Sequence, residues 1–306
     1  MGALASCTGG DGCNVHGLGA RRSRDSVFSH TETHAVNCAA DNSPPPLRLV
    51  NLGSGSRGNA SVVFAGEDSV LVDCGLSCKQ ILLRMESAGL DPSTLRAVLI
   101  THEHSDHVSG LRVTARRLGI PAYMTPACAG AVSLRGEVEV RAFTPGESFP
   151  VGPFVVEPFR VPHDTVDPVG FVVGVGEDRV GIATDLGSVN RLVISRLQTC
   201  RVVLLEFNHD VEMLLSGPYP WHLKQRVRSR HGHLSNAQAA EILQSLVGSR
   251  VEQVLLGHLS EKNNRVELAL AAAHDALEAG KALHGSGSKP IRLLVAEQAQ
   301  PTTVDN

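Results

Sequence analysis

The stretch Ala97-Val-Leu-Ile-Thr-His-Glu-His-Ser-Asp-His107 joins an apolar strand directly to a run of metal-binding side chains. Three histidines and one aspartate occupy positions 102, 104, 106 and 107. His102 and His104 are two residues apart, so an extended backbone points both imidazoles to the same side. Neutral imidazoles beside a carboxylate suit Zn²⁺ and similar ions. The sequence therefore predicts a metal site at the end of this strand.

On both sides of this stretch, short apolar strands alternate with turns and helices. Strands are predicted at 47–52, 61–65, 69–73, 97–101, 138–143, 154–160, 170–175, 180–184, 202–206, 253–257 and 291–296. Helices are predicted at 77–88, 108–118, 188–197 and 265–279, and 209–246 is expected to be largely helical with an interruption near 217–220. Each half of the chain runs strands, then helix, then strand, which favours two similar layers packed face to face.

The histidine run resembles the H-x-H-x-D-H signature of the metallo-β-lactamase superfamily, and four further landmarks of that superfamily follow in the expected order. They are Asp73 in Leu-Val-Asp-Cys-Gly, His163 in Arg-Val-Pro-His-Asp, Asp185 in Ala-Thr-Asp-Leu-Gly and His258 in Leu-Leu-Gly-His-Leu-Ser. The resemblance implies an α/β fold, the αββα metallo-β-lactamase sandwich, as a single domain over roughly residues 47–298.

The same resemblance implies a site for two divalent metal ions, with Zn²⁺ favoured and Mn²⁺ as the alternative. The first ion would be held by His102, His104 and His163, and the second by Asp106, His107 and His258. Asp185 would bridge the two ions. Asp73 would orient a ligand without binding metal itself.

Several loops also resemble the YycJ/WalJ (VicX) subgroup of bacterial metallo-hydrolases, which are exonucleases on single- and double-stranded nucleic acid. The matching segments are 51–60, 205–210, 216–236 and 257–264. This resemblance implies a metal-dependent phosphodiesterase whose substrate is nucleic acid. The alternative on the same metals is a thioesterase like glyoxalase II, or a lactamase, and a non-enzymatic scaffold that kept the fold is the third possibility.

Candidate substrate contacts come from two places in the chain. The Gly/Ser-rich loop after the first strand offers Ser54 and Asn59, and a basic stretch offers Lys224, Arg226, Arg228 and Arg230. Cations beside a binuclear centre suit a phosphodiester whose charge grows in the transition state. The spacing of two would also spread these charges around a solvated helix, and both interpretations stay open. Tyr219 and Trp221 could stack on a base or belong to the core.

The candidate catalytic residues are Asp106, which is also a predicted ligand, together with His233, Glu206 and His209. His233 resembles the histidine near the leaving group in the related tRNA 3′-end nuclease, ribonuclease Z. It is our candidate general acid, and Glu206 is its expected orienting partner. His209 is the second candidate because it follows the predicted strand 202–206.

Composition limits the remaining possibilities. The chain has 306 residues, of which 42% are hydrophobic and 19% charged, so a globular core is expected. The net charge of −3 argues against a protein that coats nucleic acid through bulk charge. No apolar stretch approaches the length of a membrane span. Because the N-terminus lacks a signal-peptide pattern and the seven cysteines suggest no disulfide framework, we expect a cytoplasmic protein.

The two ends of the chain are expected to lie outside the folded domain. Residues 1–46 are rich in Gly, Ser, Asn and Arg and finish in three prolines, so they are expected to form a disordered extension. Residues 299–306 are expected to be a C-terminal tail.

Overall fold

The computed structural model describes residues 46–285 and 287–304. The extension expected for residues 1–46 therefore falls, apart from Pro46, outside the described residues. Within them, no helix combines the length and the apolar character needed to cross a bilayer.

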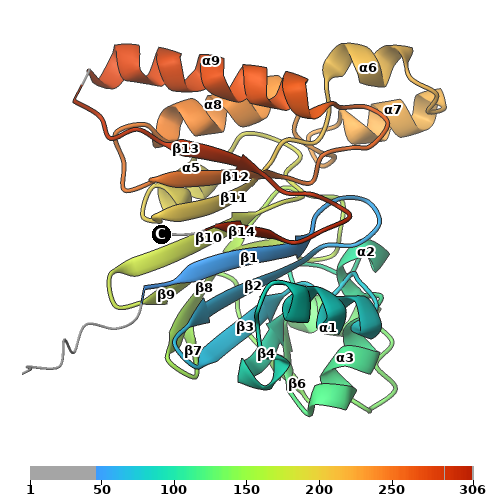
Figure 1. Cartoon of the computed structure of the whole chain (residues 1–306). Helices are drawn as coiled ribbons and strands as arrows, with labels where there is room; N and C mark the ends of the chain where they lie inside the picture. The colour runs from blue at the N-terminus through green and yellow to red at the C-terminus, as the bar shows by residue number, and fades with distance from the viewer. Residues whose placement is uncertain (1–45, 286, 305–306) are drawn as a thin grey trace, which may run out of the picture. The chain divides into compact units, whose positions relative to one another are not determined.

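Two seven-stranded β-sheets form the centre of the domain, and they face each other in Figure 1. The first sheet has the order β14-β1-β2-β3-β4-β5-β6 and the second the order β13-β12-β11-β10-β9-β8-β7. The strands of the first are Arg48–Gly53 (β1), Ala60–Ala65 (β2), Asp68–Val72 (β3), Leu95–Leu99 (β4), Ala122–Met124 (β5), Val140–Ala142 (β6) and Thr302–Val304 (β14). Those of the second are Phe149–Val151 (β7), Phe154–Arg160 (β8), Val169–Val175 (β9), Asp178–Ala183 (β10), Val202–Glu206 (β11), Gln253–Gly257 (β12) and Arg292–Val295 (β13).

Helices cover the outer face of each sheet (Figure 1). The helices in the first half of the chain are Cys78–Ser87 (α1), Ser105–Val108 (α2), Leu111–Leu118 (α3) and Pro126–Ala131 (α4), and a 3₁₀ turn spans Pro92–Thr94. Those of the second half are Arg191–Leu197 (α5), Val211–Ser216 (α6), Trp221–Val227 (α7), Asn236–Leu246 (α8) and Val266–His284 (α9). The prediction of an αββα sandwich is confirmed.

Three apolar clusters hold these layers together. One lies between the sheets and contains Phe154 and Phe171, a second packs α1 and α3 against the first sheet, and a third packs α5, α8 and α9 against the second sheet. Side chains alternate between the two faces of a strand, so neighbouring residues such as Val203 and Leu204 enter different clusters. Both faces of the sheets are therefore buried, which explains why the central strands read as continuous apolar runs.

Among the boundaries that differ from the sequence-based expectation, two change the description of the domain. The helix predicted at 108–118 is broken after Val108, and Gly110 marks the break because a Cβ there would lie 1.9 Å from the carbonyl oxygen of Leu76. The tail predicted for 299–306 contains β14, which pairs with β1 and buries Val304. The domain therefore continues past residue 298, since β14 covers what would otherwise be an open edge of the first sheet.

The topology gathers the candidate site residues at one edge of the sandwich. Strands β3 and β4 are parallel, and so are β10, β11 and β12, so the carboxyl ends within each set lie at the same edge of their sheet. The chain leaves these strand ends at residues 73, 100–107, 184–185, 206–208 and 258. All of the predicted metal ligands except His163 come from three of these segments, 100–107, 184–185 and 258, and His163 follows β8.

Candidate metal centre

Three residues of the centre have a left-handed backbone that only glycine adopts freely. The φ angles are 60° at Asp73, 58° at Asp185 and 54° at His258, and each residue lies one or two positions after a strand. Such a conformation costs a non-glycine residue of the order of 1–3 kcal/mol and persists only where the surroundings enforce it. Here it turns the chain sharply at the strand end, so that each side chain points into the centre.

The first group of ligand atoms belongs to His102, His104 and His163, which lie within 4.8 Å of one another. His163 Nδ1 donates to the carbonyl oxygen of Gly232 at 2.9 Å, which leaves the lone pair of Nε2 facing His104 Nδ1 at 3.3 Å. His102 Nε2 is buried and has no hydrogen-bond partner in the described part of the chain. Three buried nitrogens that converge in this way fit a shared cation.

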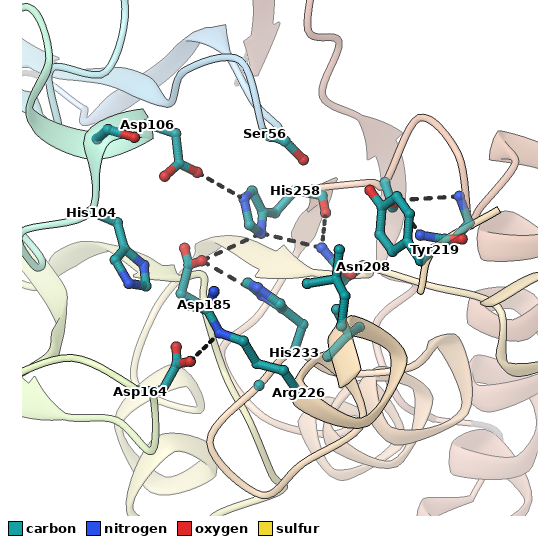
Figure 2. Close-up of a pocket in the computed structure, with 16 residues that line it drawn as sticks. Ser56, His104, Asp106, Asp164, Asp185, Asn208, Tyr219, Arg226, His233 and His258 are labelled. Atoms are coloured by element: carbon teal, nitrogen blue, oxygen red, sulfur yellow. Dashed lines mark hydrogen bonds and ion pairs between the residues drawn. The ribbon is translucent and has the colours of Figure 1, made fainter. Parts of the chain in front are cut away.

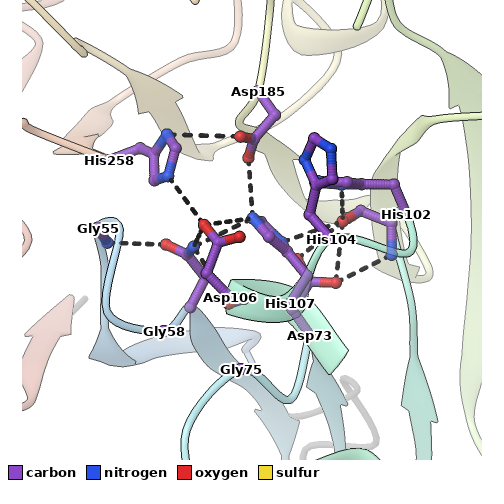
Figure 3. A network of polar contacts seen from close by, with 12 residues as sticks. Gly55, Gly58, Asp73, Gly75, His102, His104, Asp106, His107, Asp185 and His258 are labelled. Atoms are coloured by element: carbon purple, nitrogen blue, oxygen red, sulfur yellow. Dashed lines mark hydrogen bonds and ion pairs between the residues drawn. The ribbon is translucent and has the colours of Figure 1, made fainter. Parts of the chain in front are cut away.

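The second group contains Asp106, His107 and His258 (Figure 3). Asp106 Oδ2 lies 3.5 Å from His107 Nε2 and 3.7 Å from His258 Nε2. Burial alone would raise the pKa of Asp106, but the hydrogen bonds to the two histidines hold it well below its ordinary value. The group therefore offers one carboxylate and two imidazoles to a second cation.

Asp185 lies between the two groups and reaches both. Its Oδ2 is 3.2 Å from His107 Nε2, and its Oδ1 is 3.7 Å from His163 Nε2. Burial would raise the pKa of Asp185, yet the neighbouring His258 and His107 lower it well below the ordinary value. A charged, buried carboxylate that faces both groups is suited to bridge two cations.

Asp73 contacts one of the predicted ligands and the backbone at the start of the ligand-bearing segment. Its Oδ2 accepts a hydrogen bond from His107 Nδ1 at 2.8 Å, and its Oδ1 accepts from the backbone amide of Thr101 at 2.9 Å. A proton on His107 Nδ1 leaves the lone pair of Nε2 directed at the second group. Asp73 therefore orients a ligand and fixes the start of the segment that carries the others (Figure 3).

The chemistry of the donors fits divalent cations. Burial and the nearby His107 lower the pKa of His102 well below its ordinary value, so this imidazole is neutral and its lone pair is available. Imidazole nitrogen and carboxylate oxygen are donors that Zn²⁺ accepts, and carboxylate oxygen also suits Mn²⁺. The described residues thus form a centre for divalent metal.

His233 lies beside this centre (Figure 2), and it forms a second polar arrangement with Glu206. Glu206 is fully buried, and its Oε1 lies 2.8 Å from His233 Nδ1 and 3.1 Å from His258 Nδ1. Its Oε2 accepts hydrogen bonds from the backbone amides of Leu186 and Leu234 at 2.6 and 3.3 Å. Burial would raise the pKa of Glu206, but His233 lowers it below the ordinary value. A charged Glu206 thus holds Nδ1 of His233 and leaves its Nε2 for other contacts.

His209 differs from His233 in its surroundings. Its side chain is buried and does not line the cavity described next. Burial lowers the pKa of His209 to about 4, so at pH 7 the imidazole is neutral. The structure therefore gives no support to His209 as a proton donor.

A cavity of about 340 Å³ opens over the metal centre (Figure 2). His104, Asp106, Asp185, His233 and His258 form its floor. Its walls are formed by Ser56, Ser105, Asp164, Asn208, Tyr219, Leu223, Arg226, Val227, Gly232, Ser260 and Asn263. Of the two aromatic candidates, Tyr219 lines the cavity and Trp221 does not.

The basic stretch separates into three different environments. Arg226 lines the cavity, where its Nε donates to Asp164 Oδ2 at 2.5 Å. Lys224 is buried and donates from Nζ to the carbonyl oxygen of Leu215 at 2.6 Å, so the structure contradicts a direct substrate contact there. Arg228 and Arg230 are exposed and lie outside the cavity wall. Arg226 points nearly opposite to Lys224 because residues two apart on a helix lie on opposite sides, whereas Arg228 and Arg230 follow the last residue of α7, Val227.

Ser54 and Asn59 are also placed differently from the expectation. Ser54 is buried, and its Oγ accepts from the backbone amide of His258 at 2.7 Å. Asn59 is buried, and its Nδ2 lies 3.1 Å from His107 Nε2. Neither side chain lines the cavity, so both contact metal-ligand residues in place of substrate.

Several residues of the cavity wall had no place in the sequence-based prediction. Ser56, Asp164, Asn208, Ser260 and Asn263 line it, and most of them are next to a predicted site residue or within a few positions of one. Asp164 directly follows His163, and Asn208 follows the carboxyl end of β11. Their positions at or near predicted strand ends are the feature of the sequence that could have identified them.

Gly75 lets the loop after β3 approach Asp106 closely. A Cβ at this position would lie 1.6 Å from the carbonyl oxygen of Asp106, which already accepts a hydrogen bond from the backbone amide of Asn59 at 2.7 Å. We therefore expect Gly75→Ala to lower the free energy of unfolding by about 1–3 kcal/mol or more and to reduce metal content. Thermal unfolding and metal analysis measure the two effects.

Gly130→Ala is the matched control for that substitution. Gly130 lies in α4 with nothing within 4 Å of the new Cβ, so we expect unchanged or slightly higher stability. Equal melting temperatures for Gly75→Ala and the unmodified chain would contradict the close approach of the two backbones.

Comparisons with known proteins agree with this architecture. The profile of the Beta-lactamase superfamily domain matches residues 68–259. Exodeoxyribonuclease WalJ of Streptococcus pneumoniae is 38% identical over 224 residues, which cover 71% of this chain and 83% of WalJ. Exodeoxyribonuclease YycJ of Bacillus anthracis is 35% identical over 236 residues, which cover 76% of this chain and 89% of YycJ.

Among solved structures, the metallo-β-lactamase fold protein YhfI of Bacillus subtilis has a TM-score of 0.60 at 19% identity. The alignment covers 85% of this chain and all of YhfI, which shows the shared fold. The chain therefore belongs to the metallo-β-lactamase superfamily, in the family of hydrolases that contains WalJ and YycJ.

Proposed function

We propose that this chain is a binuclear metal-dependent phosphodiesterase that acts on DNA as an exonuclease. The observation that carries the proposal is the cavity, in which a guanidinium and an imidazole with a buried carboxylate partner stand beside the metal centre. The names of WalJ and YycJ, exodeoxyribonucleases with which this chain aligns over most of their length, support the choice of DNA.

The proposed ligands are the predicted ones. One ion is assigned to His102, His104 and His163, the other to Asp106, His107 and His258, with Asp185 as the bridge. Zn²⁺ is the favoured ion and Mn²⁺ the alternative, because the histidine-rich first group suits Zn²⁺ while carboxylate oxygens accept either. When bound, two such ions lower the pKa of a water and stabilise the charge that develops on a phosphoryl oxygen.

Side chains of the cavity would then bind the substrate and donate the proton. Arg226 is fixed by Asp164, so its remaining N–H groups are available to a phosphate oxygen in the cavity. His233 would donate a proton from Nε2 to the leaving oxygen, because Glu206 occupies Nδ1. Asp106 would act only as a ligand, since its pKa lies well below the range of a proton donor at neutral pH.

The rival reactions on the same metals are thioester and lactam hydrolysis. Both rival substrates carry carboxylates that Arg226 would also bind, so the choice of the phosphodiester rests on the similarity to WalJ and YycJ. The test compares turnover of bis-p-nitrophenyl phosphate, S-lactoylglutathione and nitrocefin by the metal-loaded chain. End-labelled single- and double-stranded oligonucleotides then distinguish an exonuclease, which shortens the labelled strand from one end, from an endonuclease, which releases internal fragments.

Metal removal gives the first prediction for this function. We expect about two equivalents of divalent metal per chain, loss of hydrolysis after chelation, and recovery with Zn²⁺ or Mn²⁺, because both ligand groups consist of groups that bind such ions. Elemental analysis and bis-p-nitrophenyl phosphate turnover measure this. His222→Ala, an exposed histidine outside the cavity, is expected to keep both equivalents. Full activity in the chelated chain would exclude the proposed reaction.

The cytoplasm is the proposed compartment. Cys74, Cys78, Cys128 and Cys200 are free thiols, and all four are buried. Burial raises the pKa of Cys74 to about 12, so its thiol is unreactive. These thiols are compatible with a reducing compartment.

A further inference from the structure

One wall of the cavity is apolar, whereas its floor and its other walls are mostly polar. Tyr219, Leu223 and Val227 supply the large apolar side chains among the residues that line it. Leu223 and Val227 are four residues apart on α7, so they leave the same face of that helix, and the segment before the helix adds Tyr219. In Figure 2, Tyr219 lies across the cavity from His104 and Asp106. The cavity thus offers an apolar surface that faces part of the metal centre.

Tyr219 is half-buried, and its hydroxyl group makes no hydrogen bond to any residue in 46–285 or 287–304. A tyrosine that belongs to a core buries its ring and usually finds a partner for its hydroxyl group. Leu223 is also half-buried, whereas Val227 is buried. The ring of Tyr219 and the side chain of Leu223 are therefore available to a molecule that enters the cavity.

The segment that carries Tyr219 is rigid. Pro218 and Pro220 flank it, so the φ angles of both neighbours are locked, and Tyr219 itself is restricted to extended backbone because it precedes a proline. On one side, Gly217 packs so closely that a Cβ there would lie 2.9 Å from Oδ1 of Asn263, another residue of the cavity wall. On the other side, α7 begins directly after Pro220. A ring that is held in place before a ligand arrives loses little conformational entropy on binding.

The same cavity offers groups for a phosphate. Arg226 comes between Leu223 and Val227 in the sequence of α7 and lines the cavity with them, and proposed metal ligands form the floor. The volume of about 340 Å³ is at the lower end of the range of about 300–1,000 Å³ that small-ligand sites have. This space suits one nucleotide, which carries a charged phosphate at one end and an apolar plane, the base, at the other.

We propose that Tyr219, Leu223 and Val227 form a subsite for the nucleobase of the nucleotide whose phosphate lies at the metal centre, with the base stacked on the ring of Tyr219. The proposal rests on the proposed nuclease function and specifies its substrate as a strand whose terminal base is unpaired, because a cavity that suits one nucleotide has no room for the complementary base. Every base has a face that can stack on an aromatic ring. The subsite therefore selects for a nucleobase and not for one particular base.

Binding of a nucleotide with and without its base tests the subsite directly. Isothermal titration calorimetry of the metal-loaded full-length chain compares thymidine 5′-monophosphate with 1,2-dideoxyribose 5-phosphate, which differs from it only in lacking the base. We expect the dissociation constant of the base-free compound to be about 5- to 150-fold higher, the usual effect of losing one base stack. Equal dissociation constants for the two compounds would overturn the proposal, and so would the absence of binding of thymidine 5′-monophosphate at millimolar concentration.

Substitution of Tyr219 separates stacking from a structural role. We expect Tyr219→Ala to raise the dissociation constant of thymidine 5′-monophosphate by a similar factor and that of the base-free compound much less. Tyr219→Phe keeps an aromatic ring and should recover most of the affinity. Trp221→Ala is the matched control, because Trp221 is 61% exposed, follows Tyr219 by two residues and does not line the cavity, so both constants should stay unchanged. Equal losses for the two compounds in Tyr219→Ala would mean a structural role and overturn the stacking.

The outcome for the proposed function stays separate, because binding of the two monophosphates involves no hydrolysis. Turnover of bis-p-nitrophenyl phosphate by the unmodified chain tests the phosphodiesterase. Turnover of this ester together with equal binding of the two monophosphates would overturn the base subsite and leave the phosphodiesterase intact. Absence of hydrolysis for the small ester and for oligonucleotides alike would overturn the proposed function, whereas base-dependent binding that Tyr219→Ala removes would still support the subsite.

Discussion

Replacing Asp185 with alanine is expected to abolish hydrolysis of phosphodiesters and to lower metal content below two equivalents. Within residues 46–285 and 287–304, Asp185 is the carboxylate whose oxygens face both ligand groups, at 3.2 Å from His107 Nε2 and 3.7 Å from His163 Nε2. Loss of a residue that only supports a ligand already costs about 10- to 100-fold, so loss of the proposed bridge should exceed 100-fold. Elemental analysis and turnover of bis-p-nitrophenyl phosphate measure the two effects.

Asp164→Asn is the matched control for that experiment. Asp164 lies beside the same centre, 3.5 Å from His163 Nε2, but belongs to none of the converging ligand groups. We expect this variant to keep both metal equivalents, whereas its contact with Arg226 makes weaker substrate binding the expected defect. Full metal content together with unmodified turnover in Asp185→Ala would contradict the bridging assignment.

The sequence predicts which side chains come together in the centre where they belong to short local patterns. The ligand types at 102, 104, 106 and 107 directly follow a buried strand, and the remaining predicted ligands stand at or near strand ends in the order of the resemblance. Parallel strands bring such ends to one edge. The structure accordingly brings all seven predicted ligands and Asp73 together.

Other features depend on contacts between distant segments, which no local pattern reveals. The sequence predicts that Lys224 contacts the substrate. In the structure its ammonium group is buried and donates to the carbonyl oxygen of Leu215. Ser54 lies 204 residues from His258, whose backbone it holds. Strand β14 has three residues, and its existence depends on the free edge of β1. The positions of Lys224, Ser54 and β14 depend on tertiary packing, which overrides sequence patterns in short segments.

Replacing His233 with alanine is expected to separate proton donation from metal binding. If Nε2 of His233 donates the proton, the variant should keep both metals and still bind an oligonucleotide. Turnover of the oligonucleotide, whose leaving group is a poor alkoxide, should fall by about 10²–10⁴, the usual contribution of a general acid. The p-nitrophenyl ester should lose much less, because its leaving group is already a stable anion. Steady-state rates on both substrates, together with elemental analysis, measure the contrast.

The contrast matters because Glu206 Oε1 contacts Nδ1 of both His233 and His258, so damage at one imidazole could reach the proposed ligand beside it. A damaged metal centre would slow the two substrates alike, whereas a lost proton donor slows only the one that needs the proton. His231→Ala, an exposed histidine on the same connection between α7 and α8, should leave both rates unchanged. Equal losses on the two substrates, or the loss of one metal equivalent, would make His233 a ligand or a structural residue. His209 is a poor replacement as the donor, because it is buried away from the cavity and burial lowers its pKa to about 4.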